Sequence, residues 1–175
     1  MEVAVQPRAA AAEFNSSEFR EALGTFATGV TVITTRGEEE PYGMTANAFS
    51  SVSLDPPLVL ICVISGTTGA EMIERNGVFA VNILAADQEP LSRYFASKER
   101  PRGRHAFREI PHSDGVTGSP LLDGTAGHLE CRLAARHEVG DHVIYIGEVL
   151  SLQTSSTVHP LVFHRGRYCF IREDG

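Results

Sequence analysis

Tryptophan is absent from this chain of 175 residues, and cysteine occurs only three times. Cys62, Cys131 and Cys169 are widely spaced and odd in number, so the sequence indicates no disulfide framework and favours a reducing, cytoplasmic compartment. No stretch approaches the ~20 consecutive apolar residues that a membrane-spanning helix needs. Basic residues are in the minority, and the formal net charge of -7 argues against a nucleic-acid or membrane-surface protein, because phosphate-rich partners attract positively charged faces.

Several common catalytic and nucleotide-binding motifs are also missing. The sequence contains no GxGxxG after a strand, no GxxxxGK followed by Ser or Thr, no HExxH and no GxSxG. A zinc site built from His128, Cys131, His137 and His142 is not expected, because these residues form no closely spaced ligand pair. A strand would also place His128 and Cys131 on opposite faces. Any nucleotide is therefore bound without a Rossmann or P-loop motif, and no metal is expected.

The chain is organised as a short tail followed by strands with occasional helices. Residues 1–14 contain an alanine run too short for a signal peptide and are interpreted as a disordered tail. Apolar residues at helical spacing predict a helix over residues 17–27. Two further helices are predicted over 69–76 and 88–96, and residues 97–118 are polar and irregular. Strands are predicted at 30–35, 44–49, 51–54, 58–64, 79–84, 129–137, 142–152, 161–164 and 167–171.

These elements indicate a single, mainly β domain over residues 15–175. Strands joined mostly as hairpins, with two or three short helices, are typical of a closed or nearly closed antiparallel barrel. The run LVLICVI at 58–64 is continuously apolar, which predicts a strand buried on both faces. A small barrel covers such a strand most easily with a partner subunit, so we expect a homodimer.

An unusual density of small polar residues lies on the second and third of these strands. Thr45, Asn47, Ser50, Ser51 and Ser53 place hydroxyls and an amide on strands where a core would favour Val or Ile. Such groups suit the heteroatom edge of a flat heterocycle. A half-exposed strand whose Ser and Thr face water explains the same pattern, and the residues alone do not separate the two interpretations.

Four sequence blocks together resemble the flavin reductase family. They are FREALGTFATGVTVITT at 19–35, YGMTANAFSSVSLDPPLVLIC at 42–62, FAVNIL at 79–84 and GDHVIYIGEV at 140–149. The blocks follow the family's order with similar spacing, and the resemblance covers residues 19–171. The family supplies the small partner of two-component flavin monooxygenases. The resemblance implies a split barrel, a flavin reductase-like FMN-binding fold that dimerises with flavin in a groove near the subunit interface.

The resemblance also implies a flavin site, with FMN and FAD both open. Its expected ring and ribityl contacts, and a strand end passing along the flavin, are Met44, Thr45, Ala46, Asn47, Ser53, Cys62, Val63 and Ile64. The expected phosphate pocket is Ser65, Thr67 and Thr68. Hydroxyls and free N–H groups at a helix start bind anions, which supports this assignment, although a plain N-cap turn is the alternative.

His142 is expected to meet the nicotinamide nucleotide, NADH rather than NADPH. In this interpretation Gly140 permits the tight turn, Asp141 fixes the loop, and the imidazole positions the nicotinamide. Phe107 is a further ring contact implied by the family, which often has a Lys-Phe pair where this chain has Ala106-Phe107. The basic run Lys98, Arg100, Arg102 and Arg104 is either a cap over cofactor phosphates or a solvated loop.

The resemblance therefore implies an NAD(P)H-dependent flavin reductase that passes hydride from nicotinamide C4 to flavin N5. The reduced flavin would leave for a separate monooxygenase. Two alternatives remain at this point. One is a flavin-binding module without turnover, and the other is a pyridoxamine-phosphate oxidase-like split-barrel oxidase, which would leave the Gly-Asp-His triplet unexplained.

Overall fold

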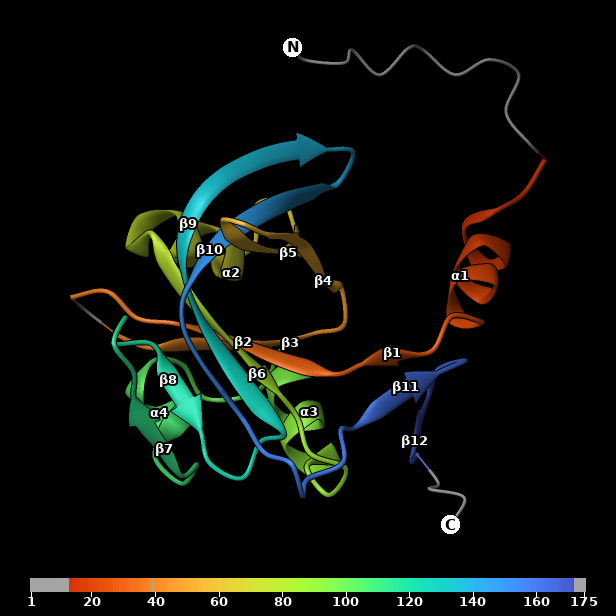
Figure 1. Ribbon diagram of the computed structural model, residues 1–175. Coiled ribbons are helices and arrows are strands. Elements are labelled where there is room, and N and C mark those ends of the chain that lie inside the picture. Colours follow the sequence, from red (N-terminus) through yellow and green to blue (C-terminus); the bar gives the residue numbers. More distant parts are fainter. Residues whose placement is uncertain (1–12, 39, 172–175) are drawn as a thin grey trace.

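The computed structural model describes residues 13–38 and 40–171 and shows a mainly β fold with short helices (Figure 1). The helices are α1 Ser16–Gly24, α2 Thr68–Asn76, α3 Glu89–Ala96 and α4 Arg104–Phe107. The strands are β1 Thr28–Gly29, β2 Thr31–Thr35, β3 Tyr42–Ala46, β4 Phe49–Leu54, β5 Pro57–Ile64, β6 Val78–Ile83, β7 His112–Asp114, β8 Pro120–Leu122, β9 Gly127–Val139, β10 His142–Thr154, β11 Val162–His164 and β12 Arg167–Cys169.

One antiparallel sheet of seven strands forms the body of the molecule, in the order β3-β2-β6-β9-β10-β5-β4. Its two edge strands, β3 and β4, are consecutive in the chain and are joined by Asn47 and Ala48. They are not neighbours in the hydrogen-bonded order of the described strands. The expected split barrel is confirmed. The strand pattern also allowed a fully closed barrel, and that possibility is wrong because the sheet is open between β3 and β4. Two small sheets, β1-β11-β12 and β7-β8, complete the fold.

Two apolar clusters lie on opposite sides of β2. Ile33 packs with Ile61, Phe79 and Tyr145 inside the curl of the large sheet, whereas Val32 packs in a second cluster with Phe95 and Phe107, among others. All five residues of β2 are buried as a result. Side chains alternate across a strand, so a strand with both faces covered is apolar or hydrogen-bonded throughout.

Helix α2 packs against the first of these clusters. Ala70 and Ile73 are its buried apolar side chains, and Gly69 leaves room for Met44, because a Cβ at Gly69 would approach the Met44 sulfur to 2.5 Å. The helix begins at the N-cap Thr67 and ends at Gly77, whose φ of 66° is the left-handed conformation that glycine adopts easily. α2 therefore has a fixed position relative to the sheet.

Helix α1 is shorter than predicted and is not packed on the body. It begins with a capping box between Asn15 and Glu18 and ends at Gly24 rather than at residue 27. None of its residues is buried, and Phe19 and Leu23 are 51% and 57% exposed. Figure 1 shows α1 standing away from the large sheet. Most of the predicted tail lies outside the described residues, but the ring of Phe14 stacks on that of Phe19 at 5.7 Å.

Two other predictions needed adjustment. The break between the polar strands predicted at 44–49 and 51–54 lies at Asn47 and Ala48 instead of at residue 50. The chain passes there from β3 to β4, and the Ala48 carbonyl accepts a hydrogen bond from the Cys62 amide of β5. The irregular stretch 97–118 contains α4 and β7, which are too short to show periodicity. None of the described helices is both long and apolar enough to cross a membrane.

Candidate functional site

The end of β5 and the start of β10 lie side by side. Their antiparallel register pairs Ile64 with His142, Val63 with Val143 and Cys62 with Ile144. Just beyond this ladder, the Ser65 amide donates to the Asp141 carbonyl at 3.0 Å. Two segments that are far apart in the sequence, 62–65 and 140–142, therefore form one surface.

The hairpin tip holds His142 in a defined state. Gly140 makes the turn with a φ of 64°, a backbone conformation that residues other than glycine rarely adopt. His142 Nδ1 lies 2.7 Å from Asp141 Oδ1, and this hydrogen bond lowers the pKa of the Asp141 carboxyl. An ionised carboxylate only accepts, so Nδ1 carries the proton and donates. The imidazole is 43% exposed, which leaves its Nε2 for a ligand.

The turn before α2 combines a cap with a cavity. Thr67 Oγ1 donates to the Ile64 carbonyl at 2.8 Å and accepts from the Ala70 amide at 3.4 Å, so it is the helix N-cap. Gly66, Thr67 and Thr68 also line a cavity of about 600 Å³, a volume in the range of small-molecule sites. The turn is therefore both a helix N-cap and a candidate anion site, because the first N–H groups of α2 lie at the edge of the cavity.

Basic side chains occupy the other wall of this cavity. Lys98, Arg100 and Arg102 line it, together with Tyr42 of β3. Arg100 donates to the Ser97 and Gly43 carbonyls and lies over the Tyr42 ring at 5.5 Å, so this guanidinium holds the loop against β3. Arg100 is therefore partly buried and forms part of the cavity wall. A cavity with several cations beside a helix N-terminus suits a phosphate group.

Sequence reasoning did not find two other residues of this cavity, Tyr42 and Glu40. Tyr42 lies two residues before the first predicted ring contact, Met44, and alternation along β3 was the available signal for it. The Glu40 carboxylate lies against Gly103, where a Cβ would collide with it, and this close approach depends on the tertiary structure alone.

The predicted ring contacts on β3 point in different directions. Met44 and Ala46 pack against the inner cluster, whereas the Thr45 hydroxyl donates to the Ser92 carbonyl of α3 at 2.6 Å. Asn47, at the corner after β3, is exposed and its amide donates to Thr28 Oγ1 at 3.4 Å. Asn47 is the exposed residue of this segment, and β3 is an edge strand of the large sheet, with no partner strand on its outer side among the described residues.

Two predicted contacts lie apart from this surface. Ser53 pairs with Leu58, at the far end of β5 from Ile64, and its hydroxyl donates to the Asp55 carbonyl at 3.1 Å. Phe107 is buried in the second cluster, with its ring 5.3 Å from that of Phe95, and only its neighbour Ala106 lines the cavity. The structure brings neither side chain to the group formed by residues 62–68 and 140–142.

The thiols differ in accessibility. Cys62 is half-buried beside Ile144, and burial raises its pKa. Burial raises the pKa of Cys131 from 9.0 to about 12, with a contribution from the neighbouring Glu130 carboxylate. Both thiols are therefore neutral near pH 7 and are weak nucleophiles.

The site offers binding groups of three kinds, namely a strand edge, a cation-lined cavity and a carboxylate-held imidazole. A planar heterocycle with a phosphate on a flexible chain matches the first two, with its phosphate near Thr67, Thr68 and Lys98. A flavin mononucleotide unit has this shape, so the residues present fit a flavin. The exposed imidazole of His142, opposite Ile64 at the end of β5, is available to a second ligand.

Comparison with known proteins gives the same result. A family model described as flavin reductase like domain matches residues 23–172. An NADH-dependent flavin reductase of Rhodococcus sp is 42% identical over 161 residues, covering 89% of this chain and 86% of the relative. The reductase subunit HsaB of a flavin-dependent monooxygenase of Rhodococcus jostii is 38% identical over 165 residues, covering 94% and 83%.

Solved structures agree in fold as well. The NADH:FAD oxidoreductase SgcE6 of Streptomyces globisporus, in complex with NAD and FAD fragments, is similar with a TM-score of 0.85 and 39% identity, covering 90% of this chain and 93% of that one. BorF, the flavin reductase component of a bacterial two-component tryptophan halogenase, gives 0.86 and 38%, covering 91% and 99%. The chain therefore belongs to the flavin reductase-like domain family, as its four sequence blocks predicted.

Proposed function

We propose that this protein is an NADH-dependent flavin reductase that supplies reduced flavin to a separate monooxygenase. The observation that carries the proposal is the junction of β5, β10 and α2: an oriented imidazole lies opposite Ile64, and the chain continues from Ile64 through Ser65 into the turn that lines a cation-lined cavity. Relatives named as NADH-dependent flavin reductases and as monooxygenase reductase subunits support it. A storage module would have no use for the oriented imidazole, and an oxidase of the pyridoxamine-phosphate type would leave it unexplained.

The protein's part in the reaction is binding and orientation. Bound flavin and NADH together supply the hydride transfer, from nicotinamide C4 to flavin N5, and this step needs no acid or base from the protein to break the C–H bond. Thr67, Thr68 and Lys98 would hold the flavin phosphate, and the backbone of 44–47 would face the ring edge. His142 Nε2 would donate to or accept from the nicotinamide nucleotide while Asp141 holds the imidazole. Positioning of this kind lowers the barrier by fixing the two reactants in a reactive geometry.

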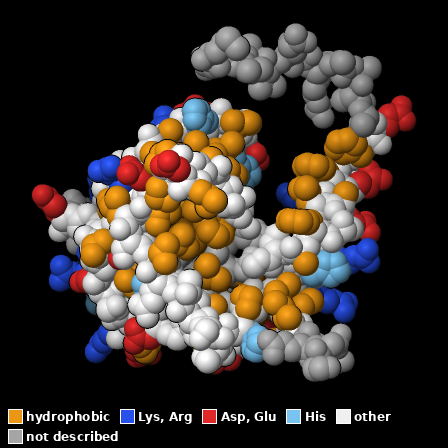
Figure 2. Space-filling model, in the orientation of Figure 1, with side chains coloured by type: hydrophobic (Ala, Val, Ile, Leu, Met, Phe, Trp, Pro, Cys, Tyr) orange, Lys and Arg blue, Asp and Glu red, His pale blue; other side chains and the backbone are white. Residues whose placement is uncertain are grey.

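We further propose that the working unit is a homodimer. The outward face of the large sheet carries apolar side chains on β5 that are only partly buried, among them Leu58 and Leu60, and Ile64 at its end is 55% exposed. Figure 2 shows hydrophobic side chains gathered in the region of β4 and β5 and, separately, along α1. A second copy of this chain covers both surfaces at once if α1 of one subunit packs on the partner, and an apolar face of this kind is typical of obligate dimers. The three free cysteines favour the reducing cytoplasm.

The test of the proposed function is the change His142→Ala. Mixing protein, flavin and NADH anaerobically while following flavin absorbance should show rapid reduction by the wild type. The variant should lose on the order of 1–3 kcal/mol of transition-state stabilisation, roughly 5- to 150-fold in kcat/KM for NADH, with flavin affinity nearly intact. His128→Ala, at the other end of β9, is the matched control. Wild-type rates in His142→Ala at all NADH concentrations contradict the assigned role.

A further inference from the structure

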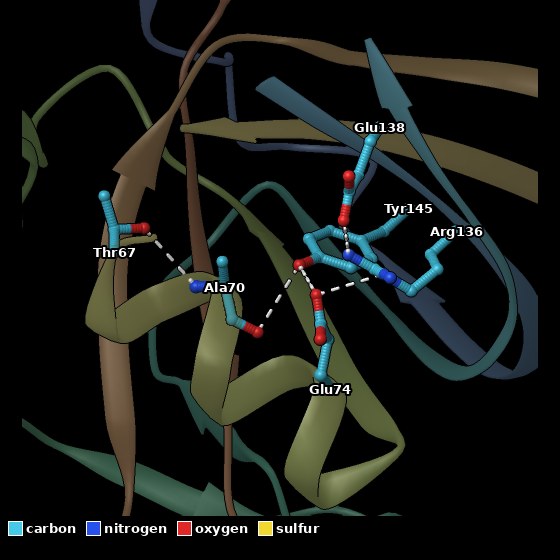
Figure 3. A network of polar contacts seen from close by, with 6 residues as sticks. All are labelled: Thr67, Ala70, Glu74, Arg136, Glu138 and Tyr145. Carbon is cyan, nitrogen blue, oxygen red and sulfur yellow. Dashed lines mark hydrogen bonds and ion pairs between the residues drawn. The ribbon is translucent and has the colours of Figure 1, made fainter. Parts of the chain in front are cut away.

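A polar network joins α2 to the β9–β10 hairpin (Figure 3). The Tyr145 hydroxyl of β10 donates to Glu74 Oε1 of α2 at 2.7 Å. Arg136 Nε of β9 lies 3.1 Å from the same oxygen, and Arg136 also pairs with Glu138. Figure 3 shows these side chains converging on Glu74, with Thr67 further along α2 toward its N-terminus. We call Glu74, Arg136 and Tyr145 the clasp.

The burial of Tyr145 makes the clasp specific. This side chain is fully buried, and burial together with Glu74 raises its pKa, so the hydroxyl keeps its proton and is the donor. A buried hydroxyl without a partner would be costly, and here it has the carboxylate and, at 3.4 Å, the Ala70 carbonyl. Tyr145 and Arg136 are directly opposite in the β9–β10 register, so both strands of the hairpin reach the same carboxylate.

The clasp acts on the β9 side of the hairpin, which has little other support, whereas β10 pairs with β5 as far as His142. β9 pairs with β6 only as far as Arg132, and the Leu133 amide then donates to the Gly77 carbonyl after α2. From there to the tip, β9 pairs with β10 alone among the described strands. Arg136 lies in the middle of this one-sided segment, so its contact with Glu74 fastens an otherwise free edge to α2.

Both ends of the linked elements belong to the candidate site. α2 starts at the Thr67–Thr68 turn beside the cavity, and the hairpin turns at Gly140–His142. We propose that Glu74, Arg136 and Tyr145 are positioning residues that set the direction of the His142 tip relative to the N-terminus of α2, and hence of nicotinamide relative to flavin. This proposal rests on the proposed function.

Release of the clasp should loosen the β9 side of the hairpin and, through the Gly140 turn, the position of the tip, and it should leave the helix in place. α2 is anchored by Ala70 and Ile73 in the inner cluster, whereas residues 136–141 are exposed. The flavin phosphate pocket should therefore stay intact while His142 loses its alignment. Loss of alignment between reacting groups reduces rate strongly, so we expect about a tenfold fall in kcat/KM for NADH without a matching change in flavin affinity.

Tyr145→Phe and Arg136→Leu test this. The first removes only the hydroxyl and keeps the ring, and the second removes an exposed cation, so neither leaves a cavity in the core. Arg136→Lys keeps the charge opposite Glu74 and should restore part of the rate. Arg132→Leu is the matched control, because Arg132 forms an ion pair of the same kind with Glu148, at 2.6 Å, in the same two strands nearer their base.

Three measurements decide the outcome: steady-state kcat and KM for NADH, the flavin dissociation constant from fluorescence titration, and amide hydrogen exchange over 136–142. Support requires a lower kcat/KM, unchanged flavin binding and faster exchange at the tip in the clasp variants but not in Arg132→Leu. Unchanged kinetics, or an equal weakening of flavin binding, overturns the proposal. If the wild type itself fails to oxidise NADH, the proposed function is wrong, and amide hydrogen exchange alone tests the clasp. Unchanged exchange over 136–142 in the clasp variants then overturns it, and faster exchange there supports it.

Discussion

The two faces of β5 carry similar side chains and have different surroundings. Val59, Ile61 and Val63 point inward and are almost completely buried, whereas Leu58, Leu60 and Cys62 on the other face are half-buried and Ile64 is more than half exposed. The apolar run predicted burial on both sides, but one chain buries only one of them. The difference indicates that the inward face is completed within the subunit and that the outward face is completed by association.

The outward face does not stop at β5. Because paired residues in an antiparallel ladder lie on the same face, Ile144 and Ile146 of β10 continue it beside Cys62 and Leu60. α1 has the same character, since Phe26 just beyond it is 76% exposed. Inward apolar residues therefore determine the stability of the fold, and outward ones determine assembly.

The largest expected effect is on the inward face. Ile61→Ala should lower the free energy of unfolding by about 2–5 kcal/mol, because it removes three buried carbons and leaves a cavity. Denaturant titration at fixed protein concentration measures this. Ile64→Ala is the matched control on the outward face, and at low protein concentration, where association contributes least, it should cost much less. Equal losses at every concentration would remove the distinction between the faces.

An intermediate effect is expected for a charge on the outward face. Leu60→Asp should weaken the dimer on the order of 100-fold, since association would bury an unpaired carboxylate, while the unfolding of the monomer changes little. Light scattering across a dilution series measures the subunit mass. Val116→Asp, the same change at an exposed loop position, should leave the mass unchanged. A wild-type protein that is monomeric and fully active at micromolar concentration contradicts the homodimer.

The smallest effect concerns the polar group on the inward side. The pKa of Tyr145 is higher in the folded protein than the value of 10.0 for an unfolded tyrosine. The protonated hydroxyl therefore contributes a stability that is fully present below pH 10.0 and is lost as the pH rises toward the folded-state pKa. Tyr145→Phe should therefore flatten the decline of the unfolding midpoint above about pH 10. Cys131 contributes a decline of the same sign in both proteins, because its pKa is raised as well. Identical alkaline slopes would show that the hydroxyl is not held in the folded state.

The sequence by itself determined the family, the mainly β architecture and the segments of the site. β-branched runs and turn residues located most strands because alternation and turn chemistry are local properties. The Gly140–Asp141–His142 turn and the cap at Thr67 were found for the same reason: each depends on neighbouring residues. Among described residues, the boundaries that moved most are at Gly24 and at Asn47–Ala48, where a cap and a corner, rather than periodicity, end the element.

Only the tertiary structure decided which of these segments meet. It put Ser65 beside Asp141 and Arg100 over Tyr42, and it placed Phe107 in a core cluster and Ser53 at the far end of β5. It also showed the clasp, whose three residues come from three elements and carry no shared motif. The physical reason is that strand pairing and helix docking act between residues far apart in the chain, so the direction of a side chain and its partners depend on register and packing that no local pattern contains.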